Sequence, residues 1–319
     1  MTYKMGIDLG GTSAKFGIVD ENNNIVLKHT IPTLAERGFE AIVKDLAQAS
    51  LATLAMAKLG LDDLEFIGIG VPSSVNPYNK KIVFANNLDW SDVDFITEFN
   101  KTLNIKVYIA NDADCAAYGE VLAGAARNAD NAIMLTLGTG VGSGMIIDGK
   151  IYLGGNGFGC EFGHSILKMG GEPCTCGRKG CIEAYASVTA LIRDSRVAVE
   201  KNSNSMMLSM VNGDLSKIEG KTSFDAAELG DETAKEVVNQ YIEYLAESVA
   251  SIINALRPKT IILGGGVSNQ KEKLLIPLIS RLEELVYGVQ FIGLPNIVVA
   301  ELGNDAGIIG AAMLGKGLE

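Results

Sequence analysis

The sequence predicts an α/β protein of two related domains, with mixed sheets and a cleft between them. Two segments, which begin near residues 5 and 132, each start with a short apolar strand, pass through a turn of glycine and threonine, and return to strand. Helices and strands then alternate in both halves, a pattern typical of α/β domains. A chain of 319 residues is long enough for about two domains with ample cores.

In the first half, four short apolar segments bounded by turn residues predict strands. They are residues 5–9, 15–20, 25–29 and 66–71. Residues 39–59 are rich in alanine and helix-periodic, and Gly60 closes this predicted helix. Ser91 is the predicted N-cap of a helix through Thr102, because Asp94 follows three residues later in a capping-box position.

The alternation continues into the second half. Residues 106–110 predict a strand that ends at Asn111-Asp112, and residues 113–125 predict a helix rich in small residues. The later predicted strands are 132–137, 145–148, 150–153, 260–263 and 296–300, of which the second and third form a hairpin around Gly149. The later predicted helices are 187–200, 223–228, 231–256, 274–286 and 305–314.

These elements predict two domains. We expect a small N-terminal domain over residues 1–110 together with the closing helix in residues 305–319, and a large domain over residues 111–304. Residues 203–221 are rich in Ser, Asn and Gly, which favours a surface connection rather than a linker between domains.

The composition is that of a soluble globular protein, with 47% apolar and 20% charged residues. A net charge of −11 provides no general basic surface for nucleic acid or an anionic membrane. No apolar run is long enough to span a bilayer, and the first residues lead directly into a strand rather than a signal peptide. We therefore expect a cytoplasmic protein with no nucleic-acid or membrane partner, in keeping with five cysteines that do not suggest a disulfide framework.

Three strand ends carry glycine turns that can bind phosphate through backbone N–H groups and, in two turns, a threonine hydroxyl. They are Gly10, Gly11 and Thr12, then Gly138, Thr139 and Gly140, then Gly264, Gly265 and Gly266. A lone glycine turn is usually only a turn, whereas three at strand ends favour nucleotide binding. Asp8 ends the first strand, where a carboxylate can hold Mg²⁺, usually through water.

Other nucleotide-binding motifs are missing from the sequence. It contains no G-x-G-x-x-G, and Gly310-x4-Gly315-Lys316 resembles a Walker A loop without the Ser or Thr that should follow the lysine. The chain is therefore predicted to be neither a dinucleotide enzyme nor a P-loop NTPase.

Asn111-Asp112 lies at the carboxyl end of a predicted strand, where active groups of α/β folds usually lie. Phosphoryl transfer from ATP to an alcohol requires a carboxylate that orients the hydroxyl and accepts its proton, together with Mg²⁺ and amides that bind the phosphates. Asp112 fits the carboxylate role. The alternative is that Asp112 only caps the helix that begins at Ala113.

A dense cluster of possible metal ligands follows the predicted hairpin. Three cysteines and one histidine form the ligand set that a structural zinc ion prefers: Cys174, Cys176, Cys181 and His164. Glu161 and Glu183 flank these ligands, so a metal would also fix two acceptor side chains. The alternative is that these side chains are buried free cysteines and a core histidine. That interpretation is common for an isolated cysteine or histidine, but it fits so dense a cluster poorly.

Together these motifs resemble the ROK family (repressors, open reading frames, sugar kinases), and within it the bacterial glucokinases. The resemblance spans nearly the whole chain and rests on Asp8-Leu9-Gly10-Gly11-Thr12, Asn111-Asp112, residues 137–142, Glu161-x-Gly163-His164 and Cys174-x-Cys176-Gly177-x2-Gly180-Cys181-x-Glu183. It implies a duplicated two-domain actin/hexokinase-like (ribonuclease H-like) fold with a central cleft. It also implies ATP- and Mg²⁺-dependent phosphorylation of a hexose, glucose first, at the 6-hydroxyl.

The resemblance further implies a role for each motif residue. Asp112 would be the catalytic base, and the sugar would be bound by Asn87, Asn111, Asp112, Glu161, His164 and Glu183. His164 would bind zinc through one ring nitrogen and face the sugar with the other, since the metal fixes the tautomer of the free nitrogen. The glycine turns and Asp8 would bind ATP and Mg²⁺. We also expect a homodimer or homotetramer.

Two departures from the family pattern leave more than one sugar as a possible substrate. Pro72-Ser73 replaces the Pro-Gly of many relatives, and Ala113-Asp114-Cys115 replaces Asn-Ala-Asn or a similar sequence. The alternatives are a kinase for N-acetylmannosamine, N-acetylglucosamine, allose or fructose, or a non-catalytic sugar sensor. The family's transcriptional repressors carry an N-terminal helix-turn-helix, which we do not expect here because the chain begins at the phosphate-binding strand.

Overall fold

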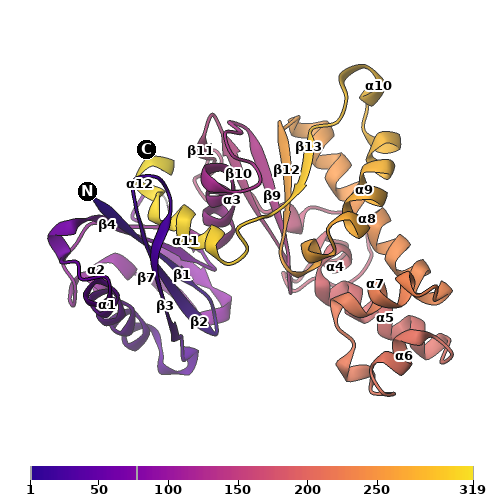
Figure 1. Cartoon of the computed structure of the whole chain (residues 1–319), viewed down its shortest axis with the longest axis horizontal. Coiled ribbons are helices and arrows are strands. Elements are labelled where there is room, and N and C mark those ends of the chain that lie inside the picture. Colours follow the sequence, from indigo (N-terminus) through magenta and orange to yellow (C-terminus); the bar gives the residue numbers. More distant parts are fainter. Residues whose placement is uncertain (1, 77, 319) are drawn as a thin grey trace. The chain divides into compact units, whose positions relative to one another are not determined.

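The computed structural model describes residues 2–76 and 78–318, and two five-stranded sheets organise its backbone (Figure 1). The first sheet has the order β3-β2-β1-β4-β8. Its strands are β1 (Tyr3–Leu9), β2 (Ser13–Val19), β3 (Ile25–Pro32), β4 (Leu64–Val71) and β8 (Val107–Asn111). The first three form an antiparallel meander, β4 pairs with β1 in parallel, and β8 pairs with β4 in parallel.

The second sheet repeats this order as β11-β10-β9-β12-β13. Its strands are β9 (Ala132–Leu137), β10 (Val141–Ile147), β11 (Lys150–Ile151), β12 (Thr260–Gly264) and β13 (Asn296–Val299). Asp148 and Gly149 have φ values of 51° and 74°, as the type I′ turn of a tight hairpin requires. The equivalent strand orders confirm the predicted duplication.

A third, antiparallel sheet is present that the sequence does not predict. It contains β5 (Ser74–Val75), β6 (Ile82–Ala85) and β7 (Trp90–Val93), which are too short for a period-two pattern to be recognised. The predicted helix start at Ser91 is therefore wrong, because Ser91 lies in β7. Helix α2 (Phe95–Asn100) begins after Asp94, whose Oδ1 accepts the N–H of Thr97 at 3.1 Å, so Asp94 is itself the N-cap.

The chain forms two compact units. The first comprises Met1–Met134, Gly144–Cys160 and Glu301–Glu319, and the second comprises Leu135–Ser143 and Glu161–Ala300. Residues 111–134 and 144–160 thus belong to the first unit, whereas the expected division assigned them to the large domain. The division into a small and a large domain stays a prediction.

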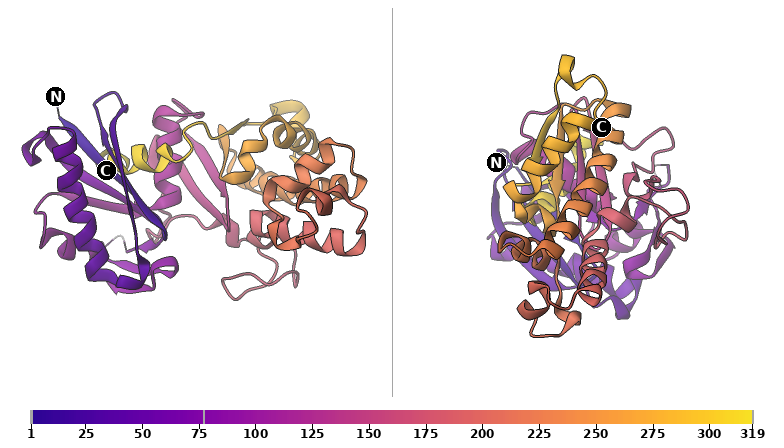
Figure 2. Two further views of the ribbon diagram at one scale, coloured as in Figure 1. Left: turned by 60° about the horizontal axis from the view of Figure 1, so that its bottom comes forward. Right: turned by 90° about the vertical axis from the view of Figure 1, so that its right-hand side faces the viewer.

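In the first unit, helices cover both faces of the first sheet (Figures 1 and 2). Met5, Ile7 and Leu9 are fully buried in the core that this face of β1 forms with α1 (Phe39–Met56). On the other face, α11 (Asp305–Ala312) contacts β1, β2 and β4, and it also packs against α3 (Asp112–Ala123). The backbones approach so closely that a Cβ on Gly6 would lie 1.9 Å from the carbonyl oxygen of Ile308. The short helix α12 (Leu314–Gly317) follows α11.

The second unit is mainly helical. Its helices are α4 (Glu183–Ala186), α5 (Val188–Lys201), α6 (Met206–Met210), α7 (Gly220–Glu228), α8 (Glu232–Leu256), α9 (Glu272–Leu285) and α10 (Val289–Ile292). Helix α8 contacts α4, α5, α7 and α9, so it is the central helix of this unit. The predicted surface connection over residues 203–221 contains the short α6, which the sequence analysis missed.

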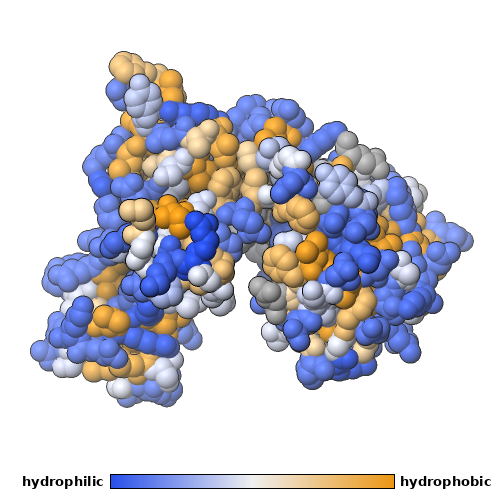
Figure 3. Space-filling model, turned by 180° about the vertical axis from the view of Figure 1, so that it is seen from behind, coloured by the Kyte–Doolittle hydropathy of each residue, from blue (hydrophilic) through white to orange (hydrophobic). Residues whose placement is uncertain are grey.

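Large apolar side chains are exposed at and beside α10. Tyr287, Phe291 and Ile292 are 81%, 85% and 64% exposed at and beside α10, where apolar side chains gather in Figure 3. Among the described residues, no helix combines the length and the apolar character needed to cross a membrane.

Candidate active site

The carboxyl ends of β1, β4 and β8 lie side by side at one edge of the first sheet. In the strand register Asp8 is opposite Gly70, and Gly70 is opposite Ala110. Asp112 follows Ala110 by two residues and therefore lies at the same edge as Asp8. The first unit thus brings together the predicted Mg²⁺-binding acid and the predicted base, at strand ends where α/β folds carry active groups.

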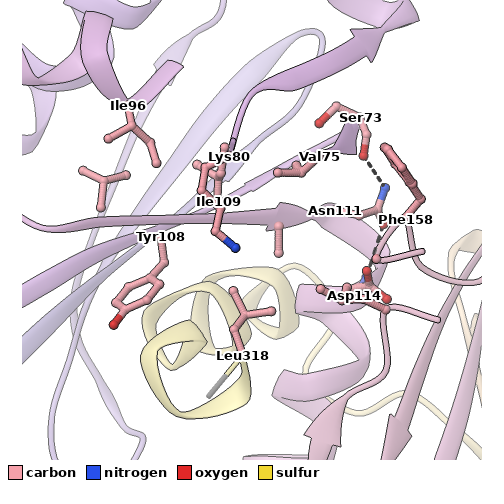
Figure 4. Close-up of a pocket in the computed structure, with 14 residues that line it drawn as sticks. Ser73, Val75, Lys80, Ile96, Tyr108, Ile109, Asn111, Asp114, Phe158 and Leu318 are labelled. Carbon is pink, nitrogen blue, oxygen red and sulfur yellow. Dashed lines mark hydrogen bonds between the residues drawn. The ribbon is translucent and has the colours of Figure 1, made fainter. Parts of the chain in front are cut away.

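Asn111, rather than Asp112, is the N-cap of α3. Its Oδ1 accepts the N–H groups of Ala113 at 2.8 Å and of Asp114 at 3.3 Å. Its Nδ2 donates to the carbonyl oxygen of Ser73 at 3.1 Å (Figure 4). Asp112 is the first helical residue, and its Oδ1 also accepts the Ala113 N–H at 2.9 Å. The N-cap residue is therefore Asn111, and Asp112 adds a second acceptor for one N–H group of the first turn.

Asn111 and Ser73 also line a pocket of about 290 Å³ in the first unit (Figure 4). Most of its walls are apolar side chains, including Ile109 of β8 and Phe158. Asp112 is not among the residues that line it. This pocket alone is therefore not the predicted reaction centre.

The turn after β1 is closed by its own hydrogen bonds. The Gly10 N–H donates to the Ser13 carbonyl oxygen at 3.0 Å, and Thr33 Oγ1 donates to the Gly10 carbonyl oxygen at 2.6 Å. A phosphate would accordingly be bound by the residues that follow Gly10 rather than by the Gly10 amide. The turn also meets the predicted sugar ligand Asn87, because a Cβ on Gly11 would lie 3.5 Å from Asn87 Cβ.

Lys15 is a site residue that the sequence analysis missed. It is opposite Asp8 in the pairing of β1 with β2, and its Nζ lies 3.3 Å from Asp8 Oδ2 and 3.2 Å from Asn304 Oδ1. Residues opposite each other in a hairpin point to the same face, so the hairpin alternation was the signal that could have found it.

The second unit gathers the four predicted zinc ligands. One ligand atom from each of His164, Cys174, Cys176 and Cys181 lies within 4.8 Å of the others. Cys176 Sγ and Cys181 Sγ are 3.7 Å apart, and Cys174 Sγ is 3.6 Å from His164 Nδ1. In a tetrahedral site with Zn–S bonds of about 2.3 Å, two sulfurs lie about 3.8 Å apart, so the cluster fits zinc.

The cysteines of this cluster differ in their surroundings. Burial raises the pKa of the Cys174 thiol to about 12. A hydrogen bond from the Arg178 backbone lowers the pKa of the exposed Cys176 thiol. All five cysteines of the chain are free of disulfides.

Glu183 connects the cysteine loop to the turn after β9. Its Oε2 accepts the Val141 N–H at 3.1 Å, and its Oε1 accepts the Thr175 hydroxyl at 2.7 Å and the Cys174 thiol at 3.4 Å. A Cβ on Gly140 would lie 2.3 Å from Glu183 Oε2, so this glycine permits the contact. Thr175 is a second site residue that the sequence analysis missed, and nothing in its local sequence signals the contact.

Glu161 and His164 lie near the same carboxylate. The His164 N–H donates to the Glu161 carbonyl oxygen at 3.0 Å. Partial burial raises the pKa of the Glu161 carboxyl above its usual value, His164 lowers it, and the negative charge of Glu183 raises it further. The second unit therefore brings the predicted sugar ligands Glu161, His164 and Glu183 within electrostatic reach of one another.

The remaining glycine turns have clear structural roles. The Gly138 N–H donates to the Gly140 carbonyl oxygen at 3.0 Å, which closes the turn after β9 as Gly10 closes the turn after β1. Gly265 has a φ of 83°, and a Cβ there would lie 2.3 Å from the Leu137 carbonyl oxygen. The fold therefore requires glycine at position 265 whether or not a phosphate binds there.

Known proteins match this chain over almost its full length. The sequence model of the ROK family matches residues 4–317. The glucokinase of Thermotoga maritima is 36% identical over 313 residues, which are 98% of this chain and 96% of the relative. The crystal structure of a ROK family glucokinase from Streptomyces griseus in complex with glucose and AMPPNP is 32% identical, covers 98% of each chain and has a TM-score of 0.83. A xylose repressor from Bacillus spizizenii is 29% identical over 98% of this chain and 76% of its own length.

Proposed function

Because the chain belongs to the ROK family, we propose that it transfers the terminal phosphoryl group of ATP to the 6-hydroxyl of glucose. The observation that carries this proposal is the likeness, over 98% of the chain, to a glucokinase whose structure contains glucose and AMPPNP. The TM-score of 0.83 also confirms the actin/hexokinase-like fold that the motifs predicted.

Asp112 is the proposed base. Its position at a strand end supports this role, as does the assignment of the capping role to Asn111. The Asp112 carboxylate would orient the 6-hydroxyl and accept its proton as the phosphoryl group is transferred.

The proposed sugar ligands are Asn87, Asn111, Asp112, Glu161, His164 and Glu183. Hydrogen bonds from Thr175 and Val141 hold the Glu183 carboxylate, which supports its use as a fixed acceptor for sugar hydroxyls.

ATP would be bound by the three glycine turns, with Asp8 as the acid that holds Mg²⁺. When bound, this ion neutralises negative charge that develops on the phosphates. Asp8 lies at the strand end beside the turn of Gly10, Gly11 and Thr12, and Lys15 limits the directions in which its carboxylate can point.

The zinc ion proposed at the cysteine loop is structural. His164, Cys174, Cys176 and Cys181 would fill all four positions of a tetrahedral site, which leaves no open position for substrate or an activated water. The ion would hold the loop and the His164 ring, and by fixing the loop it would keep the Thr175 hydroxyl in place to donate to Glu183.

A coupled assay of ADP release over a panel of hexoses tests the reaction. We expect turnover with glucose, and stronger turnover with N-acetylmannosamine, N-acetylglucosamine, allose or fructose would change the assigned substrate. The xylose repressor among the relatives favours a sugar sensor as the second candidate. Sugar binding without ADP release for any hexose would support the sensor and refute the kinase.

We also propose a homodimer or homotetramer in the cytoplasm. Exposed Tyr287, Phe291 and Ile292 support self-association, because apolar patches on soluble proteins often mark interfaces. Five free thiols support a reducing compartment. Light scattering of the purified protein should give the mass of two or four chains, and a monomeric mass would contradict the oligomer.

A further inference from the structure

Glu120 is a fully buried acid to which the proposed reaction gives no role. Its exposed fraction is 0%. Its Oε2 accepts the Ala125 N–H at 2.8 Å and the Glu301 N–H at 3.2 Å, and its Oε1 accepts the Leu302 N–H at 2.9 Å. Burial of a carboxyl group is unfavourable unless hydrogen bonds compensate it, and the three backbone donors provide that compensation.

Two of these donors belong to the segment through which the chain re-enters the first unit. The second unit ends at Ala300, and Glu301 begins the last segment of the first unit. This segment leads through Asn304 directly into α11. Glu120, near the end of α3, therefore fixes the backbone of the segment at its start.

The anchored segment reaches Asp8 by two routes. Asn304 Oδ1 lies 3.2 Å from Lys15 Nζ, which lies 3.3 Å from Asp8 Oδ2. In the first turn of α11, Gly307 packs against the same carboxyl group, because a Cβ there would lie 3.1 Å from Asp8 Cγ. The groups that confine the Asp8 side chain are thus carried by, or bonded to, the segment that Glu120 holds.

We propose that Glu120 is a positioning residue for Asp8. It holds the backbone of residues 301 and 302, and thereby the start of the segment that carries Asn304, so that Asn304 and Lys15 keep the Asp8 carboxylate in the orientation that binds the Mg²⁺ of the nucleotide. This inference rests on the proposed kinase function. A merely structural role of Glu120 would affect stability without affecting nucleotide binding.

Glu120→Gln tests the proposal, because it keeps the shape of the side chain but turns one acceptor oxygen into an NH₂ group that faces an N–H donor. We expect the amides of Glu301 and Leu302 to exchange hydrogen at least about tenfold faster. We expect the Kd for MgADP, measured by calorimetry, to rise roughly tenfold, the scale seen when a residue that orients a metal ligand is lost. The Kd for glucose should stay unchanged.

Asp231→Asn is the matched control. Asp231 is another buried acid that accepts backbone N–H groups, those of Ala234 and Met206, but it lies in the second unit as the N-cap of α8. This variant should lower the melting temperature without changing the Kd for MgADP. An equal rise of that Kd in Asp231→Asn would overturn the proposal.

Asn304→Ala tests the link to Lys15 separately, and it does so even if Glu120→Gln fails to fold. It removes the contact with Lys15 but keeps the bonds of Glu120, so MgADP binding should weaken without faster exchange at residues 301 and 302. Unchanged MgADP affinity in Asn304→Ala would refute the positioning role. Failure of the wild type to bind MgADP at all would instead refute the proposed kinase.

Discussion

Proton transfer in the proposed reaction depends on one residue, Asp112. In Asp112→Asn we expect kcat to fall by at least ~10²-fold, because an amide cannot accept the hydroxyl proton. The circular dichroism spectrum should change little, since Asn111 provides the helix cap. The affinity for glucose should also change little, because the amide can still hydrogen-bond the sugar hydroxyl. Asp62→Asn, at an exposed acid outside the site, is the control for the change in charge. A kcat near the wild-type value in Asp112→Asn would refute the assignment of Asp112 as the base.

Two threonine hydroxyls offer a matched test of the two binding sites. Thr175 Oγ1 donates to Glu183 at 2.7 Å, and Thr189 Oγ1 donates to the Thr139 carbonyl oxygen at 2.7 Å. Thr175→Val should raise KM for glucose roughly three- to tenfold, and Thr189→Val should raise KM for ATP by a similar factor, because each loses one hydrogen bond that holds its site. Steady-state kinetics with each substrate varied gives both values. If both variants changed the two KM values in the same way, Thr175 would not act on the glucose site alone and Thr189 would not act on the ATP site alone.

The cysteine loop is an element that we expect to depend on its metal. Cys176→Ala should lose stoichiometric zinc and raise KM for glucose strongly, with a smaller change in KM for ATP, because the loop holds Glu183 through Thr175 and the metal holds His164. Elemental analysis and kinetics check both effects. Cys160→Ala, which lies outside the cluster, should retain zinc. Wild-type protein that is fully active with no bound zinc would refute the structural role.

The stability of the first unit depends on the close packing of α11 on the first sheet. A Cβ on Gly68 of β4 would lie 1.7 Å from the Ala311 carbonyl oxygen, so Gly68→Ala must push the helix away from the sheet. We expect a loss of about 1–3 kcal/mol in the free energy of unfolding, the usual range for overpacking. Gly155→Ala is the control, since a Cβ there meets nothing within 4 Å. Urea denaturation measures both, and equal stability of the two variants would contradict the packing argument.

For the whole molecule, the chain's last segment completes the packing of its first sheet. Ile308 and Ala312 of α11 pack on Val19 of β2, although almost 300 residues separate them in the chain. Truncation after Asn304 should therefore leave this apolar face uncovered and abolish cooperative thermal unfolding of the first unit. Truncation after Gly317 keeps α11 and α12 and should unfold as the full chain does. A cooperative transition in the shorter protein would contradict this role of α11.

Most of the long elements were predictable because their signals are local. The alanine-rich periodicity of α1 and the apolar run of β4 act over a few consecutive residues, as does the turn chemistry at Asp148-Gly149. The spacing of Cys174, Cys176 and Cys181 likewise places three possible ligands on one loop, so the grouping of these side chains with His164 could be predicted from the chain alone.

Other features depend on residues that meet only after folding. The side chain of the cap residue Asn111 donates to the Ser73 carbonyl oxygen, and Glu183 accepts the N–H of Val141, 42 residues away. Glu120 binds Leu302 across 182 residues. The three short strands β5, β6 and β7 are too brief to carry a pattern of their own and are specified by pairing with one another. No local pattern encodes such contacts, because their free energy arises from burial and hydrogen bonding between segments that folding alone brings together.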